Sequence, residues 1–290
     1  MSPFNYLVRF ISSKGQIRYG NLSSFKPTSE IVGSEVNVLS GSIEDGFTKT
    51  SEAATVKTLL SPIEKAHQII CIGINYRQHA NEANLTVPPY PVVFCKPPDA
   101  LAGPFDDIPI PAAAQDMLDY EGELTVVVGK TGKDIPESEA LSYILGYTVG
   151  NDVSARHFQL PTTSGGQYCY AKSFDAFAPI GPLLASPSAI PDPQTLRYRT
   201  KVNGVVRQET CTDDMVWSVK QIIAHLSRGT TLRAGTVIMT GTPSGVGLFM
   251  EPKGFLKGGD VVEVEIDGIG SIIESGPLLP KGWAEGEQGD

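Results

Sequence analysis

The sequence predicts a β-rich α+β fold. Its 290 residues include 30 glycines and 22 prolines, and so many turn formers favour numerous short strands over a helix bundle. Apolar runs of strand length recur along the chain, and Asn203-Gly204 between two such runs is its strongest hairpin signal. Because these patterns fit several β-rich architectures, they predict the fold class and not the order of the strands.

The composition limits the classes of partner. Hydrophobic residues make up 41% and charged residues 19% of the chain, as is typical of a soluble globular protein. The formal net charge of -9 argues against nucleic acid. It does not exclude a small anionic substrate, because a bound metal or a lysine can reverse the local field. No run reaches the ~18 apolar residues of a membrane helix, so we expect no membrane partner.

The cysteines indicate a reducing compartment. None of the four forms a C-x-x-C pair or has zinc-finger spacing; they are Cys71, Cys95, Cys169 and Cys211. We interpret them as reduced thiols and expect a cytoplasmic protein, with mitochondria not excluded. Arg9 stands inside the first apolar run, not before it, which is unlike a secretory signal.

The first 57 residues are expected to form a small N-terminal β-module. Residues 6–11 and 16–20 are rich in β-formers and flank a short polar turn, which predicts a hairpin. Residues 36–39 form a candidate further strand. The module therefore precedes a main domain that we place at residues 58–282.

The main domain alternates apolar runs with turn-rich segments. Strands are expected at residues 68–73, 92–96, 121–129, 144–149, 236–240 and 260–266. Helices are expected at 75–84 and 218–226, the second from apolar residues spaced along one face. Residues 158–167 are rich in Thr, Ser, Gly and Pro and predict a mobile loop. The polar, acidic tail at 283–290 is expected to be disordered.

Two glutamates at a strand start suggest a cation site. Glu121 and Glu123 are two residues apart, so their carboxylates point to the same face of a strand. They repel each other unless a cation lies between them, and Mg²⁺ or Mn²⁺ prefers such oxygen ligands. The alternative is an acidic strand end in solvent, which the spacing alone favours because exposed carboxylates are common.

A third acid and a lysine strengthen the metal hypothesis. Asp152 follows the apolar run at 144–149, at the end of a predicted strand. Lys172 lies among aromatic residues, although a surface position is the usual one for lysine. Together with the two glutamates they fit a site in which three carboxylates leave coordination positions for water or substrate.

Two further motifs have less specific interpretations. His79 and Glu82 are three residues apart, so they share a helix face and form a candidate general base. The alternative is a solvated pair on an exposed helix. The loop at 241–247 is glycine-rich but lacks the Gly-Lys-Ser/Thr ending of a phosphate loop. A simple turn between strands is the alternative there.

Five ordered motifs resemble a known family. They are Gly73-Ile74-Asn75-Tyr76 with His79 and Glu82, Tyr120-Glu121-Gly122-Glu123-Leu124, the segment Gly150 to Arg156, Lys172-Ser173-Phe174-Asp175, and the segment Thr240 to Gly247. The chain resembles the fumarylacetoacetate hydrolase family over about residues 58–280, on the branch of acylpyruvases, oxaloacetate decarboxylases and oxaloacetate tautomerases. The resemblance implies a mixed β-sheet roll of the fumarylacetoacetase C-terminal type, a helix at 135–144 and a homodimer.

The resemblance also implies the roles of individual residues. Mg²⁺ or Mn²⁺ would be held by Glu121, Glu123 and Asp152. The catalytic residues would be His79 and Glu82, which activate water, and Lys172, which stabilises an enolate. Substrate contacts would come from Arg156, Gln159, Tyr170 and Thr242. One departure is His157, where the family usually has aspartate, and it puts the polar network and the lid beside Asp152 in question.

The implied reaction is cleavage of the C3–C4 bond of a 2,4-dioxo acid or 2-oxo diacid through a pyruvate enolate. Such an enzyme would be an acylpyruvate hydrolase or an oxaloacetate decarboxylase. The same site also fits keto–enol tautomerisation of oxaloacetate or a related isomerisation. An alternative of another class is a non-catalytic protein that binds 2-oxo acids with a metal.

Overall fold

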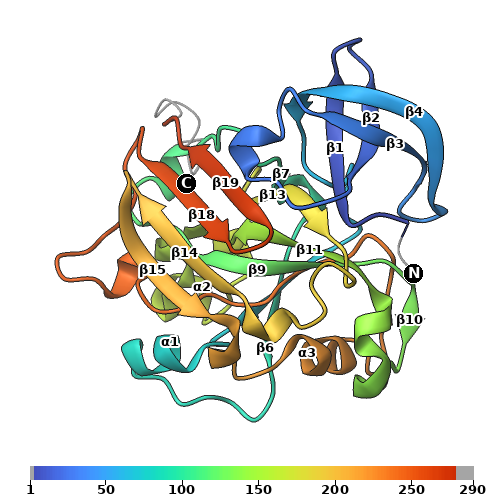
Figure 1. Ribbon diagram of the computed structural model, residues 1–290. Helices are drawn as coiled ribbons and strands as arrows, with labels where there is room; N and C mark the ends of the chain where they lie inside the picture. Colours follow the sequence, from blue (N-terminus) through green and yellow to red (C-terminus); the bar gives the residue numbers. More distant parts are fainter. Residues whose placement is uncertain (1–2, 279–290) are drawn as a thin grey trace, which may run out of the picture.

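A computed structural model describes residues 3–278, and Figure 1 shows two sheets with few helices. The α+β, β-rich prediction is confirmed. The larger sheet has eleven strands, which run in space as β2-β3-β4-β1-β13-β11-β9-β17-β5-β6 with β7 beside β13. Their bounds are β1 Tyr6–Ser12, β2 Ile17–Leu22, β3 Glu35–Ser42, β4 Gly46–Leu59, β5 Ile69–Gly73, β6 Val92–Lys96, β7 Leu101–Ala102, β9 Gly122–Val128, β11 Ile144–Asn151, β13 Ala178–Ala185 and β17 Val237–Met239.

A second sheet of four strands packs across β9 and β11 (Figure 1). Its order is β15 Val205–Cys211, β14 Arg197–Val202, β18 Val261–Ile266 and β19 Gly270–Ser275. Two short pairs join β8 Leu118–Asp119 to β12 Ser154–Ala155 and β10 Gly132–Lys133 to β16 Thr231–Leu232. The hairpin predicted at Asn203-Gly204 joins β14 to β15, and both residues have positive φ, as a tight hairpin turn requires.

The helices are short. The α-helices are α1 Arg77–Glu82, α2 Pro161–Ser164 and α3 Val219–Leu226. The 3₁₀-helices are η1 Thr28–Glu30, η2 Pro98–Ala100, η3 Ala112–Ala114, η4 Glu137–Tyr143, η5 Arg156–Gln159, η6 Tyr170–Lys172, η7 Pro193–Thr195, η8 Thr212–Asp214 and η9 Gly247–Phe249. The helix predicted at 218–226 is confirmed, and Ser218 and Gln221 cap its start with a capping box.

Other predicted elements differ in detail. The helix expected at 75–84 is the shorter α1, because Tyr76 still has an extended backbone. The helix expected at 135–144 is the 3₁₀-helix η4, confined between Pro136 and the start of β11. The mobile loop expected at 158–167 contains α2 and the end of η5 instead. The tail predicted at 283–290 lies outside the described residues.

The N-terminal strands are joined to the main sheet. Strand β1 pairs antiparallel with β13, with Tyr6 opposite Ala185, and β2 to β4 complete a sheet extension on its other side (upper right in Figure 1). Strand β4 continues to Leu59, two residues past the predicted boundary at residue 57. The division into a module and a main domain stays a prediction.

Strand β9 lies inside the molecule. It pairs with β11 on one side and β17 on the other, and every residue in it is buried. At Gly122 any side chain would collide with Thr200 and Val264 of the second sheet. Glycine there lets the two sheets close together and leaves Glu121 and Glu123 to the opposite face. The alternative of an acidic strand end in solvent is therefore wrong.

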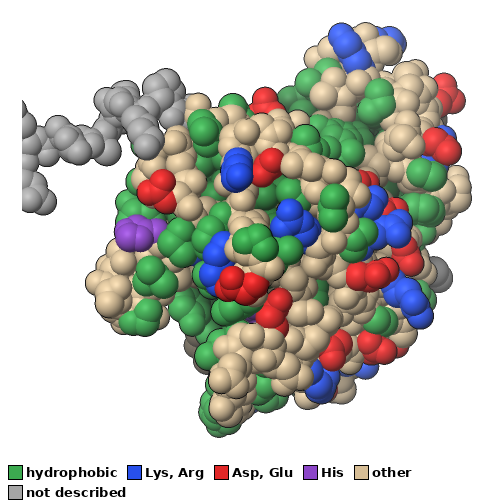
Figure 2. Space-filling model, turned by 90° about the vertical axis from the view of Figure 1, so that its left-hand side faces the viewer, with side chains coloured by type: hydrophobic (Ala, Val, Ile, Leu, Met, Phe, Trp, Pro, Cys, Tyr) green, Lys and Arg blue, Asp and Glu red, His purple; other side chains and the backbone are tan. Residues whose placement is uncertain are grey.

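The outer surface has mixed charge. Figure 2 shows one face, on which acidic and basic side chains are interspersed. Among residues 3–278, no helix has the length and apolar character needed to cross a membrane.

Candidate active site

Three buried carboxylates meet where β9 begins and β11 ends. The antiparallel register places Gly122 opposite Asn151 and Glu123 opposite Gly150, so Glu121 and Asp152 come together at the strand ends. One carboxylate oxygen from each of Glu121, Glu123 and Asp152 lies within 4.8 Å of the others. We call these three residues the acidic cluster.

Three basic side chains surround this cluster. Lys172 Nζ lies 2.7 Å from Glu121 Oε2 and 2.6 Å from Asp152 Oδ2. Lys96 Nζ lies 2.6 Å from Asp152 Oδ1 and also donates to the carbonyl oxygens of Val153 and Phe177. On the other side, Arg156 Nη1 lies 2.6 Å from Glu121 Oε1. All three cations are buried, so little solvent screens these contacts.

Glu123 differs from its two neighbours. Within the described residues it has no ion pair, and its Oε2 accepts a hydrogen bond from Gly241 N–H at 2.7 Å. Burial, reinforced by repulsion from Asp152 and Glu121, raises the pKa of Glu123 well above its usual range. Glu123 is thus the one carboxyl group of the cluster without an ion pair in the described part of the chain.

Glu121 and Lys172 both favour their charged forms. Burial alone would raise the pKa of Glu121, but Arg156 and Lys172 outweigh it and hold that pKa well below the usual 4.5. Burial alone would lower the pKa of Lys172, but Asp152 and Glu121 raise it above 10.5. These carboxylates therefore favour the ammonium form of Lys172 at the cluster.

The donor set fits a hard divalent cation. It offers three buried carboxylates close enough to share one ion, and Glu123 still lacks a positive partner. Hard cations such as Mg²⁺ and Mn²⁺ bind to oxygen ligands of this kind.

A cavity of about 180 Å³ opens beside the cluster. Its polar lining comes from six residues that the sequence singled out: His79, Glu121, Arg156, Gln159, Lys172 and Thr242. Its apolar wall is formed mainly by Ile72, Leu85, Phe94, Leu160, Tyr168, Leu248 and Phe249. A small polar ligand could reach the acidic cluster while its other end contacts this wall.

His79 and Glu82 form a pair in the cavity wall. His79 Nδ1 lies 3.1 Å from Glu82 Oε2, and Glu82 Oε1 accepts a hydrogen bond from Gly245 N–H. The His79 ring also contacts Phe249, with ring centroids 5.9 Å apart. Since the His79 side chain is only 11% exposed, the pair does not match the alternative of a solvated helix face. Its geometry leaves Nε2 as the nitrogen for a ligand.

Arg156 connects the cluster to the glycine-rich loop. Its Nε donates to Asp119 Oδ2 at 2.8 Å, and its Nη1 donates to Gln159 Oε1 at 2.9 Å. Asp119 in turn accepts hydrogen bonds from the backbone N–H groups of Gly247 and Leu248. In the described part of the chain, Arg156 Nη2 is buried without a hydrogen-bond partner, which leaves one donor of this guanidinium unsatisfied.

Thr242 is positioned with its hydroxyl already engaged. Its Oγ1 donates to the Gly122 carbonyl at 3.0 Å and accepts from Gln208 Nε2 at 2.8 Å. A contact from Thr242 to a substrate carboxylate would therefore use its backbone N–H. This role stays a prediction.

Tyr170, a predicted substrate contact, is not among the residues that line the cavity. Tyr170 is 61% exposed and packs its ring against Phe158 and Phe174, away from the cavity. Tyr168 lines the cavity instead. His157, the family departure, is exposed and packs edge-on to Phe158.

Sequence reasoning missed Lys96 and Asp119. Lys96 ends β6 and pairs with an aspartate 56 residues away along the chain, so no local spacing could reveal it. Asp119 stands directly before the motif that contains Glu121, and its proximity to that motif was the only available signal. Burial raises the pKa of Asp119, although Arg156 partly offsets this effect.

Comparisons with known proteins identify relatives of this chain. The family model described as fumarylacetoacetate (FAA) hydrolase C-terminal matches residues 68–275. The mitochondrial oxaloacetate tautomerase fahd2 of Xenopus laevis is 46% identical over 222 residues, which cover 77% of this chain and 68% of that protein. The mitochondrial human oxaloacetate tautomerase FAHD2A is 41% identical over 216 residues, or 74% of this chain and 68% of that protein.

Solved structures agree over nearly the whole chain. A 2-hydroxyhepta-2,4-diene-1,7-dioate isomerase from Mycobacterium marinum has a TM-score of 0.78 and 34% identity, covering 96% of this chain and 99% of that one. A 5-carboxymethyl-2-hydroxymuconate delta-isomerase from Mycobacterium smegmatis has a TM-score of 0.80 and 33% identity, covering 94% and 100%. The predicted roll is thereby confirmed, and this chain belongs to the fumarylacetoacetate hydrolase family.

Proposed function

We propose that this chain is an enzyme that interconverts the keto and enol forms of oxaloacetate, or shifts a double bond in a similar 2-oxo diacid. The observation that carries the proposal is the cavity that His79, Arg156 and Lys172 line together with Glu121 of the acidic cluster. The names of the relatives, tautomerases and isomerases, favour this reaction over C–C bond cleavage.

Glu121, Glu123 and Asp152 would hold the divalent cation. When bound, such a cation supplies Lewis acidity toward the oxygen atoms of a 2-oxo acid. Mg²⁺ and Mn²⁺ are the candidates, because the ligands are all carboxylates.

The chain's own residues provide the proton chemistry. Tautomerisation moves one proton between C3 and the oxygen on C2 and exchanges the C2=O double bond for a C2=C3 double bond, and no σ bond between heavier atoms breaks. His79 Nε2, with Nδ1 held by Glu82, would take the proton from C3 or return it. The Lys172 ammonium would stabilise negative charge on the C2 oxygen. Arg156 Nη2 and Gln159 would bind the distal carboxylate of the diacid.

A second candidate is cleavage of the C3–C4 bond, as in acylpyruvate hydrolysis or oxaloacetate decarboxylation. The His79–Glu82 pair favours it, because the same base could deprotonate a water molecule beside the substrate. The apolar wall would accommodate an acyl group. A non-catalytic 2-oxo acid binding protein is the third candidate, and turnover distinguishes it from the other two.

The oligomeric state and the cellular location are inferred only from the family and from the names of the relatives. We retain a homodimer as a prediction. The relatives' names place those proteins in mitochondria, so a mitochondrial location of this chain is proposed alongside the cytoplasmic one.

The test is a direct assay of the three reactions. Purified protein with Mg²⁺ or Mn²⁺ should accelerate conversion of enol-oxaloacetate to the keto form. The rate is measured as the loss of enol absorbance. Acetylpyruvate hydrolysis and oxaloacetate decarboxylation are measured in parallel, and a chelator should abolish the main activity.

Asp152→Asn should also abolish that activity, whereas Asp175→Asn, a nearby exposed carboxylate, should leave it unchanged. Full tautomerase activity in metal-free protein would overturn the cation's role. No acceleration of tautomerisation under any condition would overturn the proposed reaction, and faster hydrolysis or decarboxylation would then establish the second candidate.

A further inference from the structure

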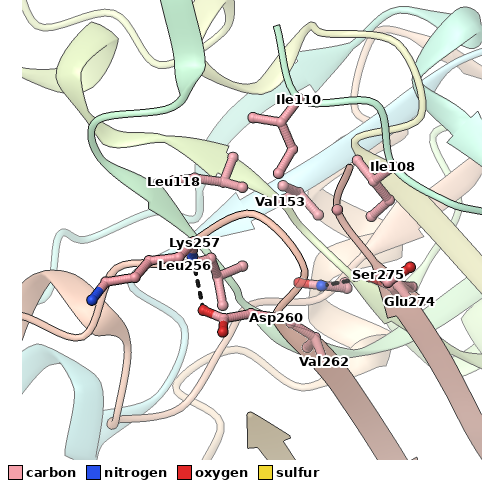
Figure 3. Close-up of a pocket in the computed structure, with 12 residues that line it drawn as sticks. Ile108, Ile110, Leu118, Val153, Leu256, Lys257, Asp260, Val262, Glu274 and Ser275 are labelled. Atoms are coloured by element: carbon pink, nitrogen blue, oxygen red, sulfur yellow. Dashed lines mark hydrogen bonds between the residues drawn. The ribbon is translucent and has the colours of Figure 1, made fainter. Parts of the chain in front are cut away.

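A further buried carboxyl group lies outside the catalytic cavity. Glu274 in β19 is only 2% exposed and borders a small, separate cavity of about 20 Å³ (Figure 3). The apolar part of that lining consists of Ile108, Ile110, Leu118, Val153, Leu256 and Val262. A carboxyl group in such surroundings is unfavourable unless it makes a specific contact.

Glu274 makes one such contact. Its Oε2 accepts a hydrogen bond from Asn151 Nδ2 at 2.9 Å. Its Oε1 has no hydrogen-bond partner among the residues that the structure describes, and burial raises the pKa of this carboxyl group to about 8. Because buried polar groups are normally satisfied, the single contact to Asn151 is the feature that can explain an acid at this position.

Asn151 leads directly to the acidic cluster. Its Oδ1 accepts a hydrogen bond from Glu121 N–H at 2.9 Å, and the following residue is Asp152. Asp152 N–H in turn donates to the Glu121 carbonyl at 2.8 Å. The Asn151 side chain thus lies between the two strand ends that carry Glu121 and Asp152.

The orientation of the Asn151 amide depends on Glu274. An amide side chain has a donor end and an acceptor end, and only one orientation presents oxygen to Glu121 N–H. Glu274 Oε2 accepts from the donor end and so selects that orientation. Without this acceptor, the amide could rotate and its donor end would face Glu121 N–H, which is also a donor.

We propose that Glu274 is a positioning residue for the acidic cluster, acting through Asn151 to fix the separation of the Glu121 and Asp152 carboxylates. It contacts neither substrate nor cation. This inference rests on the proposed divalent cation site, and partners of this kind around metal ligands typically affect metal affinity by about 10–100-fold.

The test is Mn²⁺ binding to the full chain, measured by calorimetric titration. Glu274→Met removes the acceptor but is similar in length, and it should weaken Mn²⁺ binding by about 10–100-fold. Glu274→Gln keeps a carbonyl oxygen for Asn151 and should bind Mn²⁺ as tightly as the wild type. Val262→Ala alters the same cavity without touching Asn151, so it should lower the melting temperature and leave the Mn²⁺ affinity unchanged.

Each outcome decides between the proposals. If wild-type protein binds no Mn²⁺, both the cation site and this inference fail. If the wild type binds and folded Glu274→Met binds equally well, only the inference fails. Equal weakening by Glu274→Gln and Glu274→Met would also overturn it, because the hydrogen bond would then be irrelevant. If Glu274→Met does not fold, Asn151→Ala removes the same contact and must weaken Mn²⁺ binding for the inference to stand.

Discussion

The acidic cluster and Glu274 are both buried, but they differ in the side chains that surround them. Glu121 and Asp152 contact Lys96, Arg156 and Lys172 at 2.6–2.7 Å. Glu274 has one amide partner and an apolar surrounding. The pKa of Glu121 therefore lies far below its usual value, while that of Glu274 is raised to about 8. Burial is common to both places, and the neighbouring charges decide the protonation state.

The two regions differ in what their side chains are suited to bind. Charged groups that face the cavity are suited to bind a cation and an anionic substrate, whereas a neutral carboxyl group outside it is suited to hold an amide. Glu123 is intermediate, because it faces the cluster but lacks an ion pair in the described chain. It is the ligand whose charge most needs the proposed cation.

The largest expected effect concerns the base at the cavity. His79→Ala should slow oxaloacetate tautomerisation by ~10²–10⁴, because the proton at C3 loses its acceptor. Acylpyruvate hydrolysis should fall as much, while decarboxylation should fall less, since loss of CO₂ needs no activated water. His157→Ala is the matched control and should stay near the wild-type rate, because His157 is exposed. Unchanged rates in His79→Ala would mean that His79 and Glu82 have only a structural role.

Lys96→Met would make the surroundings of Asp152 more like those of Glu274. It leaves Asp152 with one fewer cation, and breaking a buried ion pair from one side costs about 3–5 kcal/mol of unfolding free energy. Added Mn²⁺ should recover part of this loss by supplying positive charge. Urea unfolding with and without Mn²⁺ measures both effects. A loss below ~1 kcal/mol would show that Asp152 does not depend on Lys96.

Lys172→Met tests the cation that contacts both strand ends. Removing a preorganised donor should lower kcat for tautomerisation by about a hundredfold, equivalent to ~2.7 kcal/mol. Mn²⁺ should still bind, because all three carboxylates remain. Lys133→Met, which removes an exposed lysine on β10, is the control and should leave kcat unchanged. Near-normal turnover in Lys172→Met would remove Lys172 from the catalytic residues.

The sequence predicted the parts of the site that depend on local order. Strand alternation placed Glu121 and Glu123 on one face, and the run before Asp152 placed it at a strand end. Contacts set by long-range register were not visible. Lys96 reaches Asp152, and Glu274 reaches Asn151 across 123 residues, only after the sheets have formed. Which of Tyr168 and Tyr170 lines the cavity could not be predicted, because the direction of a side chain in a short turn does not follow from composition.

The last expected effect is the pH dependence that Glu274 contributes to stability. Its pKa is about 8 in the folded chain against an ordinary 4.5. Between these values the unfolded chain has lost this proton and the folded chain retains it, so the unfolded state binds fewer protons. The contribution is complete below about pH 4.5 and is lost as pH rises toward 8, at ~1.4 kcal/mol of unfolding free energy per pH unit.

Glu274→Gln removes this titration and keeps the acceptor for Asn151. The unfolding free energy of the wild type should therefore fall relative to Glu274→Gln as the pH is raised from 5 to 7, when both are measured by urea titration. Val262→Ala carries no titratable group, so its difference from the wild type should be the same at each pH. A constant difference between Glu274→Gln and the wild type would mean that Glu274 is already ionised in the folded chain. In that case Glu274 would resemble the acidic cluster, and the contrast between the two regions would disappear.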